Sequence, residues 1–391
     1  GCIMRLLAIA MRTPSQHAAA HPQAKKFTDF REMLDAMGDG IDAVFVSTAD
    51  HSHFTAAMAA MEKGKHVFVQ KPLAHNVWQV RTLQKAMHKY GVQTVMGNQG
   101  HCTEGIRLIK EWFDAGVLGE VREVHCWTDR PMAPWFIKPD SIPPKPAPVP
   151  EGLEYDLWQG PVAERPYCTE YLPQRWRAWW DYGTGVLGDI GCHCLDAPFW
   201  ALRLGAPTAV DVQLSEPAND QFTPFGAHVT YEFPAREGLP PVTLHWYEGA
   251  PRPALLPGMD KLPTNGMYMV GSQETVYHED MRPNSPMLWP RERMQRYGDV
   301  LTRKPLPRVK GGPFEELIQA VKGEGPTPGS NFDYAAPLTE LVLLGAIAIR
   351  TGQRLAWDGA NMRITNHAEF NKYLKEPARE GWDYGEALWE A

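Results

Sequence analysis

Short apolar runs alternate with helix-like segments through the first third of the chain, and this alternation limits its fold more than any other feature. Such alternation is typical of βαβ units, which build a parallel sheet with helices on both faces. Gly64 and Gly91 stand where two of the helices should end, a common place for glycine. The expected strands are 6–10, 43–47, 66–69 and 92–96, and the expected helices are 30–37, 54–63 and 77–89.

A chain of 391 residues is too long for one ordinary domain, so we expect two. The alternation of apolar runs and helix-like segments ends near residue 121, where the second domain should begin. Residues 131–150 contain eight prolines, which exclude helix and central strand and predict an ordered arm or loop. Beyond them, alternating patterns predict an antiparallel sheet with one wet face, covered by an apolar helix at 334–350. Its expected strands are 210–214, 227–233, 241–247 and 267–270.

We therefore expect an α/β, Rossmann-like domain over residues 1–120 and an α+β domain over residues 121–391. We also expect the C-terminal helices to pack back on the first domain.

Composition excludes several classes of function. The formal net charge of −7 gives no general reason to bind nucleic acid or an anionic membrane. No apolar run reaches the roughly 18–20 residues of a membrane span, and segment 4–10 is too short for a signal-peptide core. The six cysteines form neither a CxxC pair nor a disulfide framework. We expect a cytoplasmic protein with no nucleic-acid or membrane partner.

A glycine-rich dinucleotide loop is not found where a Rossmann-like domain needs it. The GxGxxG match at 183–188 follows a Trp-rich segment instead of a buried strand, so we do not interpret it as that loop. No glycine lies between Gly1 and Gly38. Either 6–10 is the first strand, or it is the second and the domain is truncated. In the second case Arg12 either favours the 2′-phosphate of NADP or is an ordinary surface arginine.

Polar residues follow the expected strands, and ligands of open α/β sheets bind beyond the carboxyl ends of strands. Lys71 follows strand 66–69. Pro72 restricts the backbone of the turn that holds Lys71, and the peptide bond between the two residues could be cis. A lysine at this edge is able to carry a proton beside a cofactor. The alternative is that these polar loops only cap their strands. The other residues after strands are Thr48, His53, Asn98 and His101.

A second cluster combines glycines with Asp189 and His193. Four residues apart, these two side chains share one helix face. The glycines before them allow a ligand to come close, although a capped helix with a satisfied histidine is the alternative. No three of His51, His53, His101 and His193 have a recognised zinc spacing, so we predict no metal site.

Together these motifs resemble the Gfo/Idh/MocA oxidoreductases (glucose-fructose oxidoreductase and inositol dehydrogenase-like) over about residues 5–380. The resemblance implies a Rossmann domain followed by an open, mostly antiparallel sheet. It also implies NAD or NADP, sugar or cyclitol substrates, and homo-dimers or tetramers formed through the sheet of the second domain. The motifs are TADHSH at 48–53, GKHVFVQKPL at 64–73, GNQGH at 97–101, GEV at 119–121, and the segment 180–193.

By this resemblance Lys71, Asp189 and His193 are the catalytic residues. The usual Glu-Lys-Pro is Gln70-Lys71-Pro72 here, so the amide supplies no negative charge beside the lysine, and the family's GxGxxG has no counterpart. The expected cofactor-binding residues are Arg12, Thr48, His53, Gln70, Lys71 and Asn98. The expected substrate-binding residues are His101, Arg177, Trp179, Trp180 and Tyr182, with core packing as the alternative for the aromatic rings.

The leading hypothesis is NAD(P)-dependent oxidation or reduction at a hydroxyl of a sugar, glycoside or cyclitol. His193 would take the hydroxyl proton, Lys71 would bind the same oxygen, and Asp189 would orient His193 or balance its charge. Two alternatives stay open. One is a redox-neutral glycoside hydrolase that uses transient oxidation. The other is a sugar-binding protein that works without a nucleotide.

Overall fold

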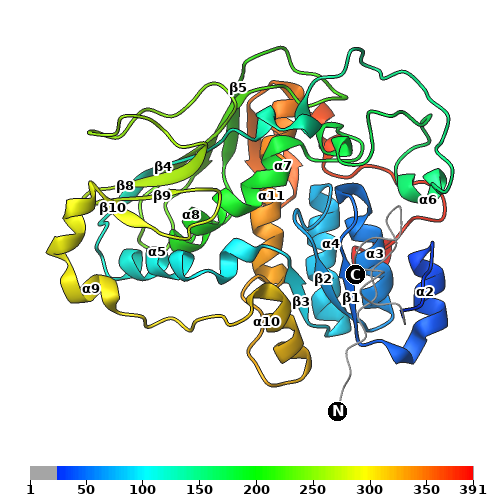
Figure 1. The fold of residues 1–391 in the computed structure, drawn as a ribbon, viewed down its shortest axis with the longest axis horizontal. Helices are drawn as coiled ribbons and strands as arrows, with labels where there is room; N and C mark the ends of the chain where they lie inside the picture. The colour runs from blue at the N-terminus through cyan, green and yellow to red at the C-terminus, as the bar shows by residue number, and fades with distance from the viewer. Residues whose placement is uncertain (1–23, 391) are drawn as a thin grey trace.

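The computed structural model describes residues 24–390, which form a three-stranded parallel sheet and a nine-stranded mixed sheet (Figure 1). The expected strand 6–10 and the expected cofactor residue Arg12 lie outside the described residues. The predicted fold class, a Rossmann-like parallel sheet followed by a mostly antiparallel one, is confirmed.

The first sheet consists of β1 (Ala43–Val46), β2 (His66–Val69) and β3 (Thr94–Met96), paired in parallel in that order. Its strands are mostly buried, as apolar runs in a parallel sheet should be. The helices that connect them end within two residues of the predicted positions, and Gly91 caps α4 with a left-handed φ of 62°. These helices are α2 (Phe30–Met37), α3 (His53–Glu62) and α4 (Val77–Tyr90).

The second sheet has the order β10-β9-β8-β4-β7-β6-β5-β11-β12. Its neighbouring strands are antiparallel except for β4 and β7, which run parallel. Along β6 buried residues alternate with partly exposed ones, so one face packs on the core and the other is wetter. The strands are β4 (Val121–Thr128), β5 (Ala209–Leu214), β6 (Ala227–Phe233), β7 (Val242–Glu248), β8 (Asn265–Gly271), β9 (Thr275–Glu279), β10 (Met287–Trp289), β11 (Leu355–Asp358) and β12 (Arg363–Ile364).

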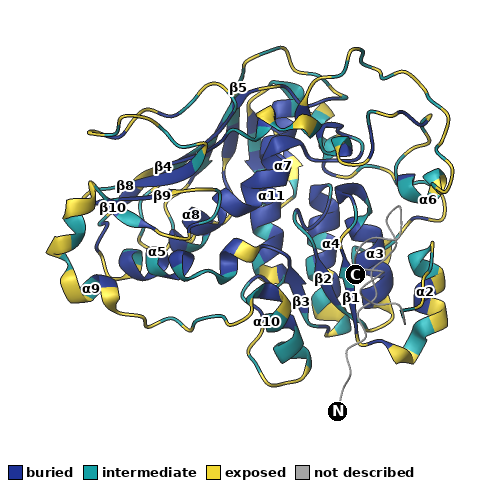
Figure 2. Cartoon of the chain, in the orientation of Figure 1, coloured by how far each residue is buried: buried dark blue, intermediate teal, exposed yellow. Residues whose placement is uncertain are grey.

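Helix α11 (Phe332–Thr351) lies between the two sheets, where it contacts α4 and β3 on one side and α7 and β5 on the other (Figure 1). By length and composition it could cross a membrane, but 83% of its most apolar stretch is buried, as in the core helix of a soluble protein. Figure 2 shows the same concentration of buried residues in α3, α7 and α11. The α-helices that contribute less to this core are α5 (Glu104–Asp114), α6 (Tyr155–Gln159), α9 (Gly298–Thr302) and α10 (Gly312–Val321).

Helix α7 (Gly185–Cys194) is followed directly by α8 (Asp196–Ala201). Pro198 does not end α8, because it lies in the first turn, where the backbone N–H groups have no partner inside the helix. The predicted arm at 131–150 contains two 3₁₀ turns near its start and no longer helix or strand.

Two C-terminal parts of the chain pack on the first sheet and its helices: α11 contacts α4 and β3, and the segment after β12 follows as 3₁₀ turns and extended chain. Trp389 stacks on Trp78 of α4, and its Nε1 donates to Thr82 Oγ1 at 2.8 Å.

Candidate active site

The turn after β2 brings Lys71 against helix α7. The Lys71–Pro72 peptide bond is cis. Lys71 Nζ donates to Asp189 Oδ1 at 2.9 Å and also to the backbone carbonyl of Asp189. Gly188 in the first turn of α7 leaves room for the side chain of Thr184, since a Cβ there would lie 1.7 Å from Thr184 Oγ1. Two predicted catalytic residues, 118 positions apart in the sequence, therefore form an ion pair.

Asp189 faces three cations. Besides Lys71, the Nε atoms of Arg130 and Arg177 lie 3.4 and 3.5 Å from its carboxylate oxygens, and its side chain is only 9% exposed. Burial alone would raise the pKa of Asp189. The charges of Lys71 and Arg177, the hydrogen bond from Lys71 and the charge of Arg130 outweigh burial and lower this pKa to about 2. Asp189 is therefore a carboxylate near neutral pH.

His193 lies one helical turn beyond Asp189 and is buried. Its Nδ1 is 2.7 Å from Asn98 Oδ1, while Asn98 Nδ2 donates to the carbonyl of Cys192 at 2.8 Å. Because the amide is oriented by that second bond, Oδ1 can only accept, and we assign the proton of the imidazole to Nδ1. The lone pair of Nε2 is then available, since no hydrogen bond to it is recorded within residues 24–390.

Burial, together with the charges of Lys71 and Arg282, holds the pKa of His193 well below its usual value. The imidazole is therefore neutral near pH 7. Of the two roles expected for Asp189, orienting His193 or balancing its charge, the hydrogen bond to the imidazole is made by Asn98, an expected cofactor-binding residue.

His53 uses both ring nitrogens on the backbone. It contacts the carbonyls of Pro72 at 2.8 Å and Thr48 at 3.2 Å, and it is almost fully buried. It therefore joins the turn that carries Lys71 to the loop after β1. The side chain of Thr48 accepts a hydrogen bond from Ser52 Oγ at 2.8 Å. These contacts show that His53 and Thr48 help to hold the two loops of the site in place.

The aromatic residues before α7 lie in the protein core. Trp179, Trp180 and Tyr182 are each 3% exposed or less. The indole nitrogens of the two tryptophans donate to the backbone carbonyls of Glu170 and Asn219 at 3.2 and 2.8 Å. The three rings are therefore packed in the core, which was the alternative to substrate binding.

Two other predicted residues also have protein partners. His101 Nδ1 lies 2.9 Å from Asp196 Oδ1, and both side chains are buried. Arg177 contacts Asp189, as described above. The side chain of Gln70 lies against Gly97 at the end of β3, since a Cβ on Gly97 would be 2.9 Å from Gln70 Oε1.

Two further arginines of the site, Arg130 and Arg282, were not predicted from the sequence. Arg130 begins the 3₁₀ turn that leads into the arm, and Arg282 follows β9. Arg282 Nη2 donates to Gln99 Oε1 at 3.3 Å, while its buried Nε has no hydrogen-bond partner among the described residues. Single arginines in loops carry no spacing signal, so only the fold identifies them.

Cations outnumber carboxylates among the charges that act most strongly on His193. Lys71, Arg282 and Arg130 lower its pKa, and Asp189 raises it. Two other buried carboxylates, Asp50 and Asp196, are engaged by Thr184 and His101. His193 therefore lies in a positive local field, although the whole chain is acidic.

Comparison with known proteins identifies the family. Residues 5–98 match the oxidoreductase family with an NAD-binding Rossmann fold, and residues 105–236 match the C-terminal alpha/beta domain of the same family. The chain belongs to the Gfo/Idh/MocA oxidoreductases.

Among its relatives, inositol 2-dehydrogenase 3 of Saccharopolyspora erythraea is 34% identical over 26% of this chain and 30% of the relative. The 1,5-anhydro-D-fructose reductase of Ensifer adhaerens is 30% identical over 55% of this chain and 53% of the relative. The chain thus spans between about a third and a half of the length of these relatives.

The WlbA dehydrogenase from Bordetella pertussis, solved with NADH and UDP-GlcNAcA, has a similar fold. Its TM-score is 0.59 at 17% identity, and the match covers 88% of this chain and 86% of that one.

In a Gfo/Idh/MocA chain, the groups beyond the carboxyl ends of the parallel strands should suit a nicotinamide. The groups present here do suit one. An ammonium, an amide and a neutral imidazole converge beyond the carboxyl ends of β2 and β3. Within residues 24–390 no glycine-rich loop follows a strand of the parallel sheet. The GxGxxG match lies at the start of α7, after a 3₁₀ turn, which confirms that it is not the dinucleotide loop.

Proposed function

We propose that this chain is an NAD(P)-dependent oxidoreductase that acts on a hydroxyl carbon of a sugar, glycoside or cyclitol. The observation that carries the proposal is the neutral, buried His193 beside Lys71 at the carboxyl edge of a parallel sheet. The relatives described above are named as a dehydrogenase and a reductase. These names favour net redox chemistry over the hydrolase alternative.

The nicotinamide, when bound, supplies hydride chemistry, and the residues of the chain handle the proton. In oxidation, Nε2 of His193 takes the proton of the substrate hydroxyl. Lys71 Nζ donates a hydrogen bond to the same oxygen and stabilises the negative charge that develops there. Asn98 Oδ1 accepts a hydrogen bond from the Nδ1–H of His193 before and after the transfer, so it keeps the ring in one orientation.

Asp189 acts through Lys71. Its carboxylate holds the ammonium at 2.9 Å, and its negative charge favours the imidazolium that forms at His193. In the proposed complex, Thr48, Gln70 and Asn98 would line the nicotinamide end, because they follow the three parallel strands.

We also infer that the substrate carries an acidic group, such as a carboxylate or a phosphate. More cations than carboxylates act strongly on His193, and the Nε of Arg282 is buried without a partner in the described chain. An anion beside Arg282 would cancel part of the charge that lowers the pKa of His193, so binding would make His193 a better base. A neutral sugar would leave that charge in place.

The function is tested with NADH and NADPH titrations followed by nicotinamide fluorescence. Neutral sugars, uronic acids and phosphorylated sugars are then compared as substrates. We expect reduced cofactor to form in amounts that match the oxidised sugar, with acidic sugars favoured. For acidic substrates R282Q should raise KM more than kcat falls, while neutral sugars should be little affected. Sugar binding without dinucleotide affinity would instead support the nucleotide-independent alternative.

The oligomeric state, domain boundary and location also belong to this proposal. We propose a homo-dimer or tetramer formed through the sheet of the second domain, which begins near residue 121. Its expected location is the cytoplasm. The five cysteines within the described chain are all free thiols, as expected for a reducing compartment.

A further inference from the structure

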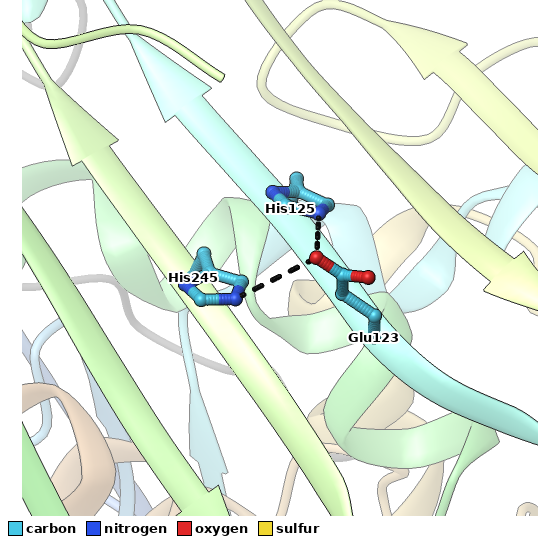
Figure 3. A group of neighbouring side chains, drawn as sticks. All are labelled: Glu123, His125 and His245. Atoms are coloured by element: carbon cyan, nitrogen blue, oxygen red, sulfur yellow. Dashed lines mark hydrogen bonds and ion pairs between the residues drawn. The ribbon is translucent and has the colours of Figure 1, made fainter. Parts of the chain in front are cut away.

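We propose that Glu123, His125 and His245 form a binding site for a divalent transition-metal ion, with zinc the best match (Figure 3). The site lies on the face of the large sheet opposite α7. Cys126 of β4 contacts the carbonyl of Cys194 in α7, and side chains alternate along a strand, so Glu123 and His125 point away from that helix. The site is therefore separate from Lys71 and His193 and does not depend on the proposed function.

Strand pairing brings the three side chains together. β4 and β7 are parallel neighbours in which His125 lies directly opposite His245, and Glu123 is two residues earlier on the same face of β4. The Nε2 atoms of His125 and His245 lie 2.9 and 3.8 Å from the same oxygen, Oε1 of Glu123. All three ligand atoms lie within 4.8 Å of one another.

These separations suit a tetrahedral ion. Zinc bonds of about 2.0–2.2 Å place neighbouring ligand atoms about 3.3 Å apart, between the two distances observed. The three ligand atoms, all within 4.8 Å of one another, would close to about 3.3 Å around the ion. Two imidazoles and one carboxylate form a three-ligand set that zinc binds in proteins with water as the fourth ligand.

The nitrogens that face away from the proposed ion already have partners. Nδ1 of His125 lies 3.2 Å from Tyr247 Oη, and Nδ1 of His245 lies 3.0 Å from His228 Nε2. Histidines that bind metals usually have such a hydrogen bond at the second nitrogen, which fixes the ring. Here both rings are fixed with Nε2 aimed at Glu123, as Figure 3 shows. A chance contact between a histidine and a glutamate would not need a hydrogen bond at the second nitrogen of each ring, so these bonds favour a metal site.

The charge state also suits a metal. Burial is the main cause that lowers the pKa of His125, and it lowers the pKa of His245 to about 4, so these imidazoles offer lone pairs at neutral pH. Glu123 is 51% exposed in the single chain, whereas the two histidines are mostly buried.

The test is a titration of the metal-free, full-length chain with zinc, in competition with a chromophoric chelator. Cobalt(II) serves as a spectroscopic probe in a parallel titration. We expect one zinc per chain at this site. We also expect a tetrahedral cobalt spectrum without thiolate charge-transfer bands, because the site contains no cysteine.

The E123Q and H245N variants should lose this binding. H228N should weaken it by about 10–100-fold, because it removes the support of His245 and no ligand. The matched control is H367N. His367 and Glu369 form another histidine–glutamate pair, with Nδ1 and Oε1 3.3 Å apart, but no third ligand among residues 24–390 joins them. H367N should bind zinc like the wild type.

Circular dichroism and thermal unfolding check that each variant folds. E123Q changes an exposed side chain, so it keeps the test decisive even if H245N unfolds. The proposal is overturned if the wild type takes up no zinc, or if E123Q binds zinc as tightly as the wild type.

Discussion

Replacing Asp189 with asparagine removes the one carboxylate that faces Lys71, Arg130 and Arg177. Its pKa is about 2, against 3.8 for an ordinary aspartate. At about 1.36 kcal/mol per pH unit, this difference corresponds to about 2.4 kcal/mol of stability at neutral pH. D189N should therefore lower the free energy of unfolding by about 2–3 kcal/mol at pH 7.

The pH dependence follows from the direction of the shift. Because the pKa is lowered by folding, the stabilisation is complete above the unfolded value of 3.8 and is lost as the pH falls through about 2. The difference between wild type and D189N should thus stay constant from pH 8 to pH 5. It should shrink to about half at pH 3.

Urea unfolding of both proteins across this pH range measures the effect. D114N is the matched control, because Asp114 also contacts a lysine and an arginine but is 36% exposed. The control should change stability by less than about 1 kcal/mol. Equal stability of D189N and wild type at pH 7, or a difference that is the same at pH 3 as at pH 7, would refute the reasoning.

Three further predictions follow. K71M and H193N should each lower turnover by about 10²–10⁴-fold, with dinucleotide affinity little changed in H193N, and near-full activity in both would contradict their assigned roles. The pKa of His193 is lowered by folding, so its stabilisation is complete above about 6.5 and falls with pH below that. In urea unfolding, the stability difference between wild type and H193N should therefore decline by about 1.4 kcal/mol per pH unit below pH 6, and a constant difference would argue against a neutral, buried imidazole. G345A should cost about 1–3 kcal/mol in a thermal melt, because its Cβ would lie 2.0 Å from Tyr231 Oη, whereas G40A, with open space around it, serves as the control.

The first sheet could be predicted from the sequence because parallel strands are buried on both faces and appear as apolar runs. β2 begins and ends at the predicted residues, and α11 extends the predicted helix by two residues at its start and one at its end. The short strands β9 to β12 were missed, because two to five residues carry too little periodicity to identify a strand. The eight-residue strand β4 was also missed, because its last five residues are all buried and do not alternate.

The site was harder to predict, because its geometry depends on contacts between distant segments. Lys71, Asp189 and His193 stand in recognisable motifs, and the structure brings them together. The role of Asn98 in orienting His193 depends on how β3 meets α7, which no local pattern encodes. In the same way, the pairing of His125 with His245 follows from the register of two strands about 120 residues apart.

The measurement that tests the central claim most directly is the binding of NADH and NADPH to the purified 391-residue chain, compared between wild type and H193N. The account predicts that at least one dinucleotide binds both proteins. It further predicts that reduction of NAD or NADP by a sugar is seen in the wild type and is about 10²–10⁴-fold slower in H193N. A folded wild-type chain that binds neither dinucleotide would contradict the account, and so would equal turnover in the two proteins.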